Sequence, residues 1–215
     1  MRTNVRFPSV CLFTASLLGW FAGCSSIPAQ AQEAGKAKCL FNGKDLTGWV
    51  TPDDKAIFSV EDGEIVGRTQ GNLKKNEFLV TAKPYRDFVL KAKVKYKNGN
   101  SGIQFRSKRA ANGAVSGPQA DIAKGFWGLL YEERGRGMLE RYPEAAANKL
   151  VKANDWNEFV ISAKGKHVTI DFNGTRIIDR TDPEFADQGI IAFQVHVGPP
   201  MEVRFKDIEI TELGN

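Results

Sequence analysis

Three short segments alternate apolar residues with side chains that bind ligands or transfer protons. They are residues 103–106, 119–122 and 193–197. Because successive side chains of a strand point to opposite faces, each segment predicts a strand with one apolar and one polar face. The polar faces carry amides, an arginine, an acid and a histidine: Gln104, Arg106, Gln119, Asp121, Gln194 and His196.

These side chains suit a saccharide groove if the three strands lie in one curved sheet. Amides both donate and accept hydrogen bonds, as sugar hydroxyls require. The carboxylate of Asp121 or the imidazole of His196 can move protons, and an unperturbed histidine titrates at about 6.5. Taken singly, each residue is better explained by exposure to water or a structural role. The repetition in three segments is what indicates a site.

The segment from Gly125 to Leu139 mixes aromatic, acidic and basic residues with glycines, which is typical of a ligand-binding loop. Trp127 and Tyr131 could lie against the apolar face of a sugar ring, although Trp127 suits core packing equally well. A hard cation held by Asp121, Glu133 or His196 stays open. The sequence has no zinc, serine-triad or P-loop signature.

The elements that would position these residues are short strands. Runs of β-branched and aromatic residues are separated by turn pairs, which are Asn42-Gly43, Asp62-Gly63, Asn98-Gly99, Asn112-Gly113 and Asn173-Gly174. Many short strands with frequent turns predict an all-β sandwich or barrel.

Other strands lack such polar chemistry. Residues 88–97 alternate apolar residues with lysines, which predicts a strand with one face in water. Residues 168–172 and 176–179 flank Asn173-Gly174 and predict a hairpin. Residues 143–149 have a helical composition but are too few for an independent helix, so we expect a turn within a loop.

The first residues predict export from a bacterial cytoplasm. Arg2 and Arg6 precede an apolar run at 10–23, and small residues end in Ala31, which is typical of a signal peptide over 1–31. The alternative is a lipoprotein signal over 1–23 with Cys24 lipidated. Either signal predicts a periplasmic, cell-envelope or secreted protein. The run is shorter than the ~20 residues of a transmembrane helix, so none is expected.

The remaining chain predicts a linker over 32–38 and one domain over 39–215. Cys39 is the only cysteine of that part, so no internal disulfide is expected. The formal charge of the whole chain is +5, of which Arg2 and Arg6 contribute two. The lysines are spread along strands rather than clustered with aromatic residues, so we expect no nucleic-acid partner.

Several blocks resemble the 3-keto-disaccharide hydrolase family, formerly a domain of unknown function. In chain order these blocks are residues 40–49, 100–106, 119–122, 127–131, 155–157 and 205–208. The resemblance covers residues 39–212 and implies a concanavalin-like jelly roll of two antiparallel sheets. One departure is Pro118, at a position where the family resembled often has an aromatic residue. Since proline lacks an N–H group, the strand could start or bulge there.

The resemblance implies a hydrolase or lyase acting on a glycoside whose C3 hydroxyl a separate sugar 3-oxidoreductase has oxidised. A base removes the acidified C2 proton, the enolate expels the C1 substituent, and water then adds, unlike the two-carboxylate route of ordinary glycosidases.

In that chemistry we expect Asp121 or His196 as the base. Arg106 would stabilise the enolate and Glu133 would act as an acid. The ring would be held by Gln104, Gln119, Trp127, Tyr131 and Gln194. The alternative is a non-catalytic, lectin-like carbohydrate-binding domain of the cell envelope, because one fold can host binding or catalysis.

Overall fold

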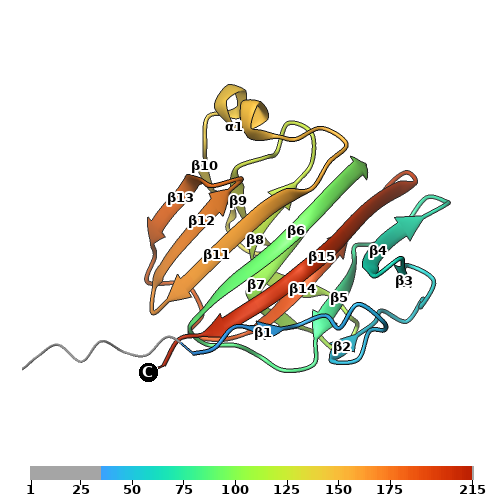
Figure 1. The fold of residues 1–215 in the computed structure, drawn as a ribbon, viewed down its shortest axis with the longest axis horizontal. Helices are drawn as coiled ribbons and strands as arrows, with labels where there is room; N and C mark the ends of the chain where they lie inside the picture. Colours follow the sequence, from blue (N-terminus) through green and yellow to red (C-terminus); the bar gives the residue numbers. More distant parts are fainter. Residues whose placement is uncertain (1–34, 215) are drawn as a thin grey trace, which may run out of the picture. The chain divides into compact units, whose positions relative to one another are not determined.

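Two antiparallel sheets pack face to face in the computed structural model, which describes residues 35–214 (Figure 1). The strands of the eight-stranded sheet are β1 (Lys38–Cys39), β3 (Phe58–Glu61), β4 (Glu64–Thr69), β6 (Phe88–Asn98), β11 (Asn157–Lys164), β12 (His167–Phe172), β13 (Thr175–Thr181) and β15 (Met201–Glu212). Their order is β13-β12-β11-β6-β15-β4-β3, and β1 pairs with β15.

The seven-stranded sheet has the order β10-β9-β8-β7-β14-β5-β2. Its strands are β2 (Trp49–Val50), β5 (Glu77–Thr81), β7 (Ser101–Arg109), β8 (Val115–Ile122), β9 (Leu129–Glu133), β10 (Gly137–Arg141) and β14 (Ile190–Val195). The all-β sandwich predicted from the sequence is therefore confirmed.

The core lies between the two sheets, where the apolar halves of the alternating strands meet. Phe193 of β14 stacks on Phe205 of β15 with ring centroids 4.1 Å apart, and Trp49 of β2 stacks on Phe193 at 5.1 Å. Burying an aromatic side chain removes about 150–250 Å² from water, so these rings contribute strongly to the packing of one sheet on the other.

The strand and the hairpin expected to lack polar site chemistry are confirmed. In β6 the buried residues Phe88, Leu90, Ala92 and Val94 alternate with lysines that face outward. The hairpin of β12 and β13 turns at Asn173-Gly174, where Gly174 has a φ of 82° that glycine adopts without strain.

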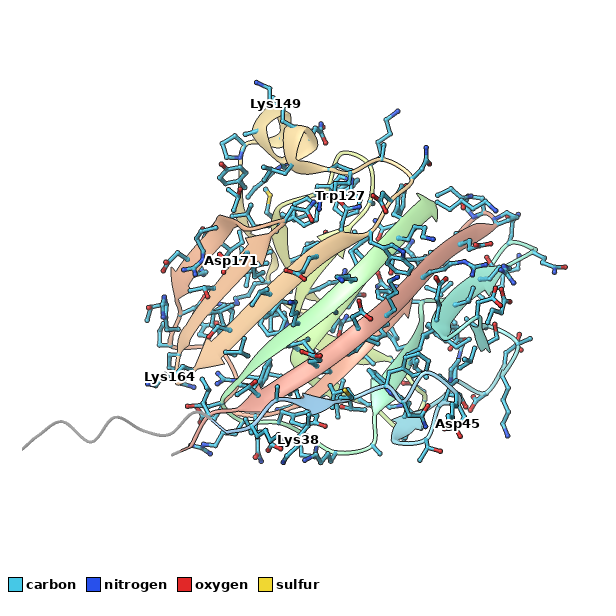
Figure 2. All side chains as sticks on the ribbon, viewed as in Figure 1. Lys38, Asp45, Trp127, Lys149, Lys164 and Asp171 are labelled. Atoms are coloured by element: carbon cyan, nitrogen blue, oxygen red, sulfur yellow. The ribbon has the colours of Figure 1, made fainter. Side chains whose placement is uncertain are left out.

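The helix α1 (Glu144–Leu150) corrects the prediction of a turn within a loop. Ala147 is fully buried and Leu150 packs against the main core cluster. Tertiary packing therefore stabilises seven residues that would not form a helix alone. Lys149 points outward from the helix (Figure 2).

The predicted signal over 1–31, its lipoprotein alternative at Cys24 and residues 32–34 of the predicted linker lie outside the described residues. Cys39 is exposed and has a free thiol. Within residues 35–214, no helix combines the length and the apolar character needed to cross a membrane.

Candidate functional site

The three segments with polar alternation become neighbouring strands of one sheet, in the order β8-β7-β14. Gln104 of β7 lies opposite Gln119 of β8, and Gly102 lies opposite Asp121. Ala192 of β14 lies opposite Gln104 on the other side of β7. This register brings four of the expected side chains to one face: Gln104, Gln119, Asp121 and Gln194.

These side chains form a chain of hydrogen bonds beneath the surface. Gln104 Nε2 donates to Gln119 Oε1 at 3.1 Å. Gln119 Nε2 donates to Asp121 Oδ1 at 2.5 Å and to Gln194 Oε1 at 3.4 Å. Gln194 Nε2 continues to Glu133 Oε2 at 3.4 Å. The three glutamines are buried, so this network holds the two carboxylates in place.

Gly102 makes room for the network. A Cβ atom at this position would lie 2.3 Å from Gln119 Cδ and 2.7 Å from Gln119 Nε2. Both distances are shorter than atoms tolerate, so the Gln119 side chain fits here only because residue 102 has none.

Asp121 is the buried acid of the site and is 6% exposed. Burial raises the pKa of Asp121 from 3.8 to about 7; the Gln119 hydrogen bond opposes this shift, and the nearby Glu133 charge adds to it. The carboxyl group can therefore accept or donate a proton near neutral pH.

Asn76 connects Glu133 with the loop that carries His196. Asn76 Nδ2 donates to Glu133 Oε1 at 3.2 Å, and its Oδ1 accepts from the Val197 backbone N–H at 2.8 Å. Both Glu133 oxygens thus accept hydrogen bonds, one of them from Gln194. In this arrangement Glu133 is an acceptor rather than a proton donor.

His196 follows β14 and is half-buried. Its Nδ1 lies 2.6 Å from the carbonyl oxygen of Val197. Because a carbonyl oxygen only accepts, Nδ1 carries a proton and donates. Nε2 is left available to a ligand.

These groups surround an open cavity of about 560 Å³. Five predicted residues line the cavity: Gln119, Asp121, Tyr131, Glu133 and His196. Gln104 and Gln194 lie behind it as supports of the network. A volume of this size is within the range of small-molecule sites.

Arg106 does not share the polar face of Gln104, which corrects the sequence interpretation. Gln104 pairs with Gln119 and Lys108 pairs with Ser116, so β7 advances four residues where β8 advances three. β7 therefore has one extra residue, which forms a bulge. The bulge is opposite Gly117 and Pro118, and proline has no N–H group for the ladder. Arg106 takes a φ of 46° within it.

The bulge turns the Arg106 side chain toward the loops of the other sheet. Its guanidinium donates to Asp87 Oδ1 at 2.7 Å and to the carbonyl oxygens of Arg86, Gly165 and Ala186. Arg106 is 1% exposed and does not line the cavity with Asp121. It therefore ties loops together, and the geometry gives no support to the enolate role.

Trp127 also lies outside the cavity of Asp121. Its ring stacks on Phe172 with centroids 5.2 Å apart and meets Tyr96 edge-on at 5.7 Å. Core packing, the alternative left open from the sequence, is what the structure shows. The expected ligand loop over 125–139 is mostly the β9–β10 hairpin, and its residues Tyr131 and Glu133 do reach the cavity.

Sequence reasoning missed several residues that line the cavity. They are Asn76, Asn100, Phe126, Leu129, Met138 and Arg141. Arg141 places a cation where Arg106 does not, and it donates to Glu144 and to the Gly125 carbonyl oxygen, each at 2.6 Å. Asn100 begins one of the family blocks, which was the available signal. Nothing in the local sequence of Arg141 separates it from a surface arginine.

The described residues give no support to the cation site that the sequence left open at Asp121, Glu133 or His196. Among residues 35–214, no three histidine, cysteine or acidic side chains are grouped closely enough to hold a metal ion.

The model of the 3-keto-alpha-glucoside-1,2-lyase-like domain family matches residues 36–211. No curated protein matches the chain. A candidate glycosyl hydrolase from Parabacteroides distasonis has a similar structure, with a TM-score of 0.62 at 25% identity, covering 84% of this chain and 94% of that one.

Two more distant structures share the fold. Carbohydrate-binding module CBM66 from Bacillus subtilis has a TM-score of 0.56 at 16% identity, covering 77% of this chain and 96% of the module. The β-glucanase of Bacillus licheniformis has a TM-score of 0.59 at 12% identity, covering 84% and 99%. These likenesses confirm the concanavalin-like jelly roll expected from the sequence.

Proposed function

The chain belongs to the 3-keto-alpha-glucoside-1,2-lyase-like domain family, and from this membership we propose that it cleaves 3-keto-glycosides by removing the C2 proton and expelling the C1 substituent. The observation that carries the proposal is Asp121, a buried carboxyl group in a cavity with a pKa raised to about 7. A C3 ketone acidifies the C2 proton, so a carboxylate of this basicity is a suitable base.

Asp121 is the base in this proposal. Gln119 fixes Oδ1 of the carboxylate by a 2.5 Å hydrogen bond. The second oxygen, Oδ2, accepts no hydrogen bond from residues 35–214. A base held by one oxygen keeps the other free for the substrate. The C2–H electron pair then forms the C2=C3 bond of the enolate, with the negative charge on the C3 oxygen.

His196 is the acid that completes the elimination. As the enolate re-forms the ketone, a C1=C2 bond forms and the C1–O bond breaks, so the leaving oxygen needs a proton. His196 has its Nδ1 fixed on the Val197 carbonyl oxygen, which leaves Nε2 to deliver that proton in the imidazolium form. Water then adds to the unsaturated product.

Arg141 takes the electrostatic role first assigned to Arg106. Its guanidinium lines the cavity and is fixed by the Gly125 carbonyl oxygen and Glu144. A cation in this position can stabilise the enolate oxygen. Tyr131, Phe126 and Met138 supply the apolar and aromatic surface against which a sugar ring can lie.

The test is to follow leaving-group release from a 3-keto-α-glucoside beside the unoxidised glucoside. Release from the keto sugar alone supports the proposal, because only the ketone acidifies C2. Release from the unoxidised sugar would indicate ordinary glycosidase chemistry. Binding without any release would favour a carbohydrate-binding domain, the function named for the similar Bacillus subtilis module.

Exchange of the C2 proton with D₂O separates the two proposed roles. His196→Gln should keep the exchange and lose most of the release, because proton removal precedes loss of the leaving group. Asp121→Asn should lose both. If His196→Gln lost exchange while Asp121→Asn kept it, the two assignments would be reversed.

The proposed reaction needs a preceding oxidation of the C3 hydroxyl to a ketone. We therefore propose a sugar 3-oxidoreductase as a partner in the reaction sequence. The proposal also places the enzyme outside the cytoplasm, on the basis of the basic and apolar pattern of residues 1–31.

A further inference from the structure

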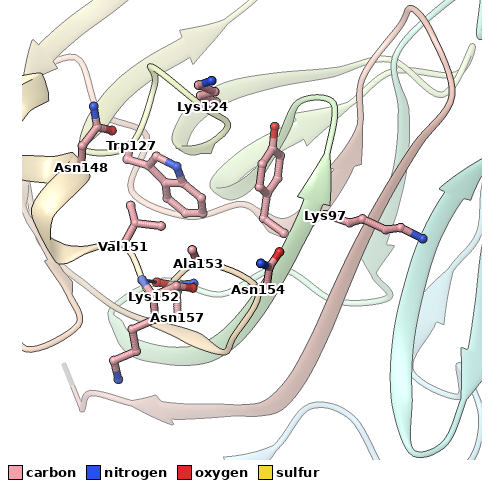
Figure 3. A pocket seen from close by; sticks show the side chains of 10 residues that line it. Lys97, Lys124, Trp127, Asn148, Val151, Lys152, Ala153, Asn154 and Asn157 are labelled. Atoms are coloured by element: carbon pink, nitrogen blue, oxygen red, sulfur yellow. Dashed lines mark hydrogen bonds between the residues drawn. The ribbon is translucent and has the colours of Figure 1, made fainter.

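A second cavity, of about 300 Å³, lies beside α1 at one end of β6 (Figure 3). It shares no lining residue with the cavity of Asp121. Trp127, Val151 and Tyr96 provide apolar and aromatic walls, and Asn148 and Asn154 provide amides. Figure 3 shows the Trp127 ring between Lys124 and Val151.

Trp127 has an unused hydrogen-bond donor at this cavity. The side chain is 4% exposed, yet its indole N–H has no hydrogen-bond partner among residues 35–214. Two fully buried polar side-chain atoms have no partner in that range, Asn100 Oδ1 and Gln104 Oε1. The Trp127 indole nitrogen is not one of them, so it is not fully buried and remains accessible.

A buried tryptophan N–H normally finds an acceptor. Trp49 shows the ordinary case in this protein, since its Nε1 donates to the Leu40 carbonyl oxygen at 2.8 Å. The N–H of Trp127 has no such partner among residues 35–214 and remains accessible, so an acceptor that enters the cavity can take its hydrogen bond.

The charge around the cavity defines that ligand further. Three lysines line the cavity and no acidic residue does. Lys97 is 3.5 Å from Glu202, and its side chain extends away from Trp127 (Figure 3). Lys124 has no ion pair among the described residues, so its charge is free to attract an anion. Lys152 is also unpaired in that range, but its side chain extends away from Trp127 (Figure 3).

We propose that this cavity is a second ligand site, which binds a monosaccharide-sized organic acid. Its carboxylate accepts a hydrogen bond from the Trp127 indole N–H and is attracted by Lys124. The asparagine amides bind its hydroxyl groups, and the aromatic and aliphatic walls cover its apolar face. The cavity volume suits one such unit.

The test follows the indole ¹H–¹⁵N resonance of Trp127 in the full protein while glucuronate is added, with glucose as the uncharged counterpart. Glucuronate should shift this resonance saturably, and glucose should shift it much less. Lys124→Ala should weaken glucuronate binding by up to about fivefold, and added salt should weaken it too. Absence of a shift, or equal shifts with both sugars, would overturn the proposal.

Lys149→Ala is the matched control, because Lys149 lies on α1 and does not line the cavity (Figure 2). It should leave glucuronate binding unchanged, and an equal loss in both lysine variants would overturn the proposal. Asp121→Asn should also leave the titration unchanged. This second control makes the result independent of whether the proposed elimination occurs.

Discussion

The outer faces of the two sheets use polar residues in opposite ways. On the eight-stranded sheet, Lys93 lies 2.8 Å from Asp207 and Lys91 lies 3.2 Å from Glu158, all of them in contact with water. On the seven-stranded sheet, the corresponding positions carry buried amides around Asp121. Both faces result from the same period-two alternation, so the alternation by itself does not identify a site.

The difference lies in what surrounds each carboxylate. Asp207 is paired with a lysine, which lowers the pKa of that carboxyl group. Asp121 is surrounded by neutral amides and is desolvated, which raises its pKa to about 7. A paired, hydrated carboxylate is a poor base, whereas an unpaired and buried one retains its basicity. Asp121, unlike Asp207, has no ion pair among residues 35–214, and this difference distinguishes the reactive face from the other one.

The most severe test of this comparison is Asp121→Asn. The amide keeps the shape and can still accept from Gln119, but it cannot take a proton. We expect kcat/KM on a 3-keto-glycoside to fall by about 10³, a typical contribution of a general base. Steady-state kinetics measures this, with circular dichroism to verify the fold. A variant with more than a tenth of wild-type activity would remove Asp121 as the base.

The same substitution should also change the pH dependence of stability. The folded pKa of Asp121, about 7, is above the ordinary 3.8, so the folded protein keeps a proton that the unfolded chain has released. Wild-type stability from this group is present below about pH 4 and is lost as the pH rises to about 7.

Asp121→Asn removes that loss. At pH 8 we expect the variant to exceed the wild type in free energy of unfolding by on the order of 3 kcal/mol, with a much smaller difference at pH 4. Urea denaturation at the two pH values measures it. A difference that does not depend on pH would show that Asp121 is not desolvated as described.

Gly102→Ala tests the support of the network without touching an acid. The added methyl group would meet Gln119, so that side chain must shift and lose its hydrogen bond to Asp121. We expect kcat/KM to fall by about tenfold or more, and stability to fall by about 1–3 kcal/mol from overpacking. Gly71→Ala is the matched control, since no atom lies within 4 Å of its added Cβ. Equal activity in both variants would contradict the role of Gly102.

The smallest effect is expected from Asp207→Asn, the same chemical change on the other sheet. It breaks the exposed pair with Lys93, and such pairs contribute about 0–1 kcal/mol. We expect kcat/KM to stay within twofold of wild type and stability to change by about 0.5 kcal/mol. Loss of activity comparable to that of Asp121→Asn would end the distinction between the two faces.

Much of the site could be predicted from the sequence because it depends on strand periodicity. Alternation placed Gln104, Gln119, Asp121 and Gln194 on one face, and the structure confirms that their strands are neighbours. Alternation failed at Arg106, because it assumes a regular strand and a bulge reverses the face of every later residue.

The remaining differences come from tertiary contacts that no local pattern encodes. Trp127 is drawn into the core by Phe159 and Phe172, which are distant in sequence. Arg141 reaches the cavity because β10 is the edge strand beside β9. The helix α1 forms because the sandwich buries Ala147.

The position of β15 has a consequence for how the domain is made. This last strand lies between β6 and β4, inside the eight-stranded sheet, and also pairs with β1 at the start of the fold. During synthesis, the earlier strands of that sheet therefore lack their central partner until residues 201–212 have emerged. Completion of the sheet must follow translation of nearly the whole domain, and its contacts of long sequence separation favour slow folding.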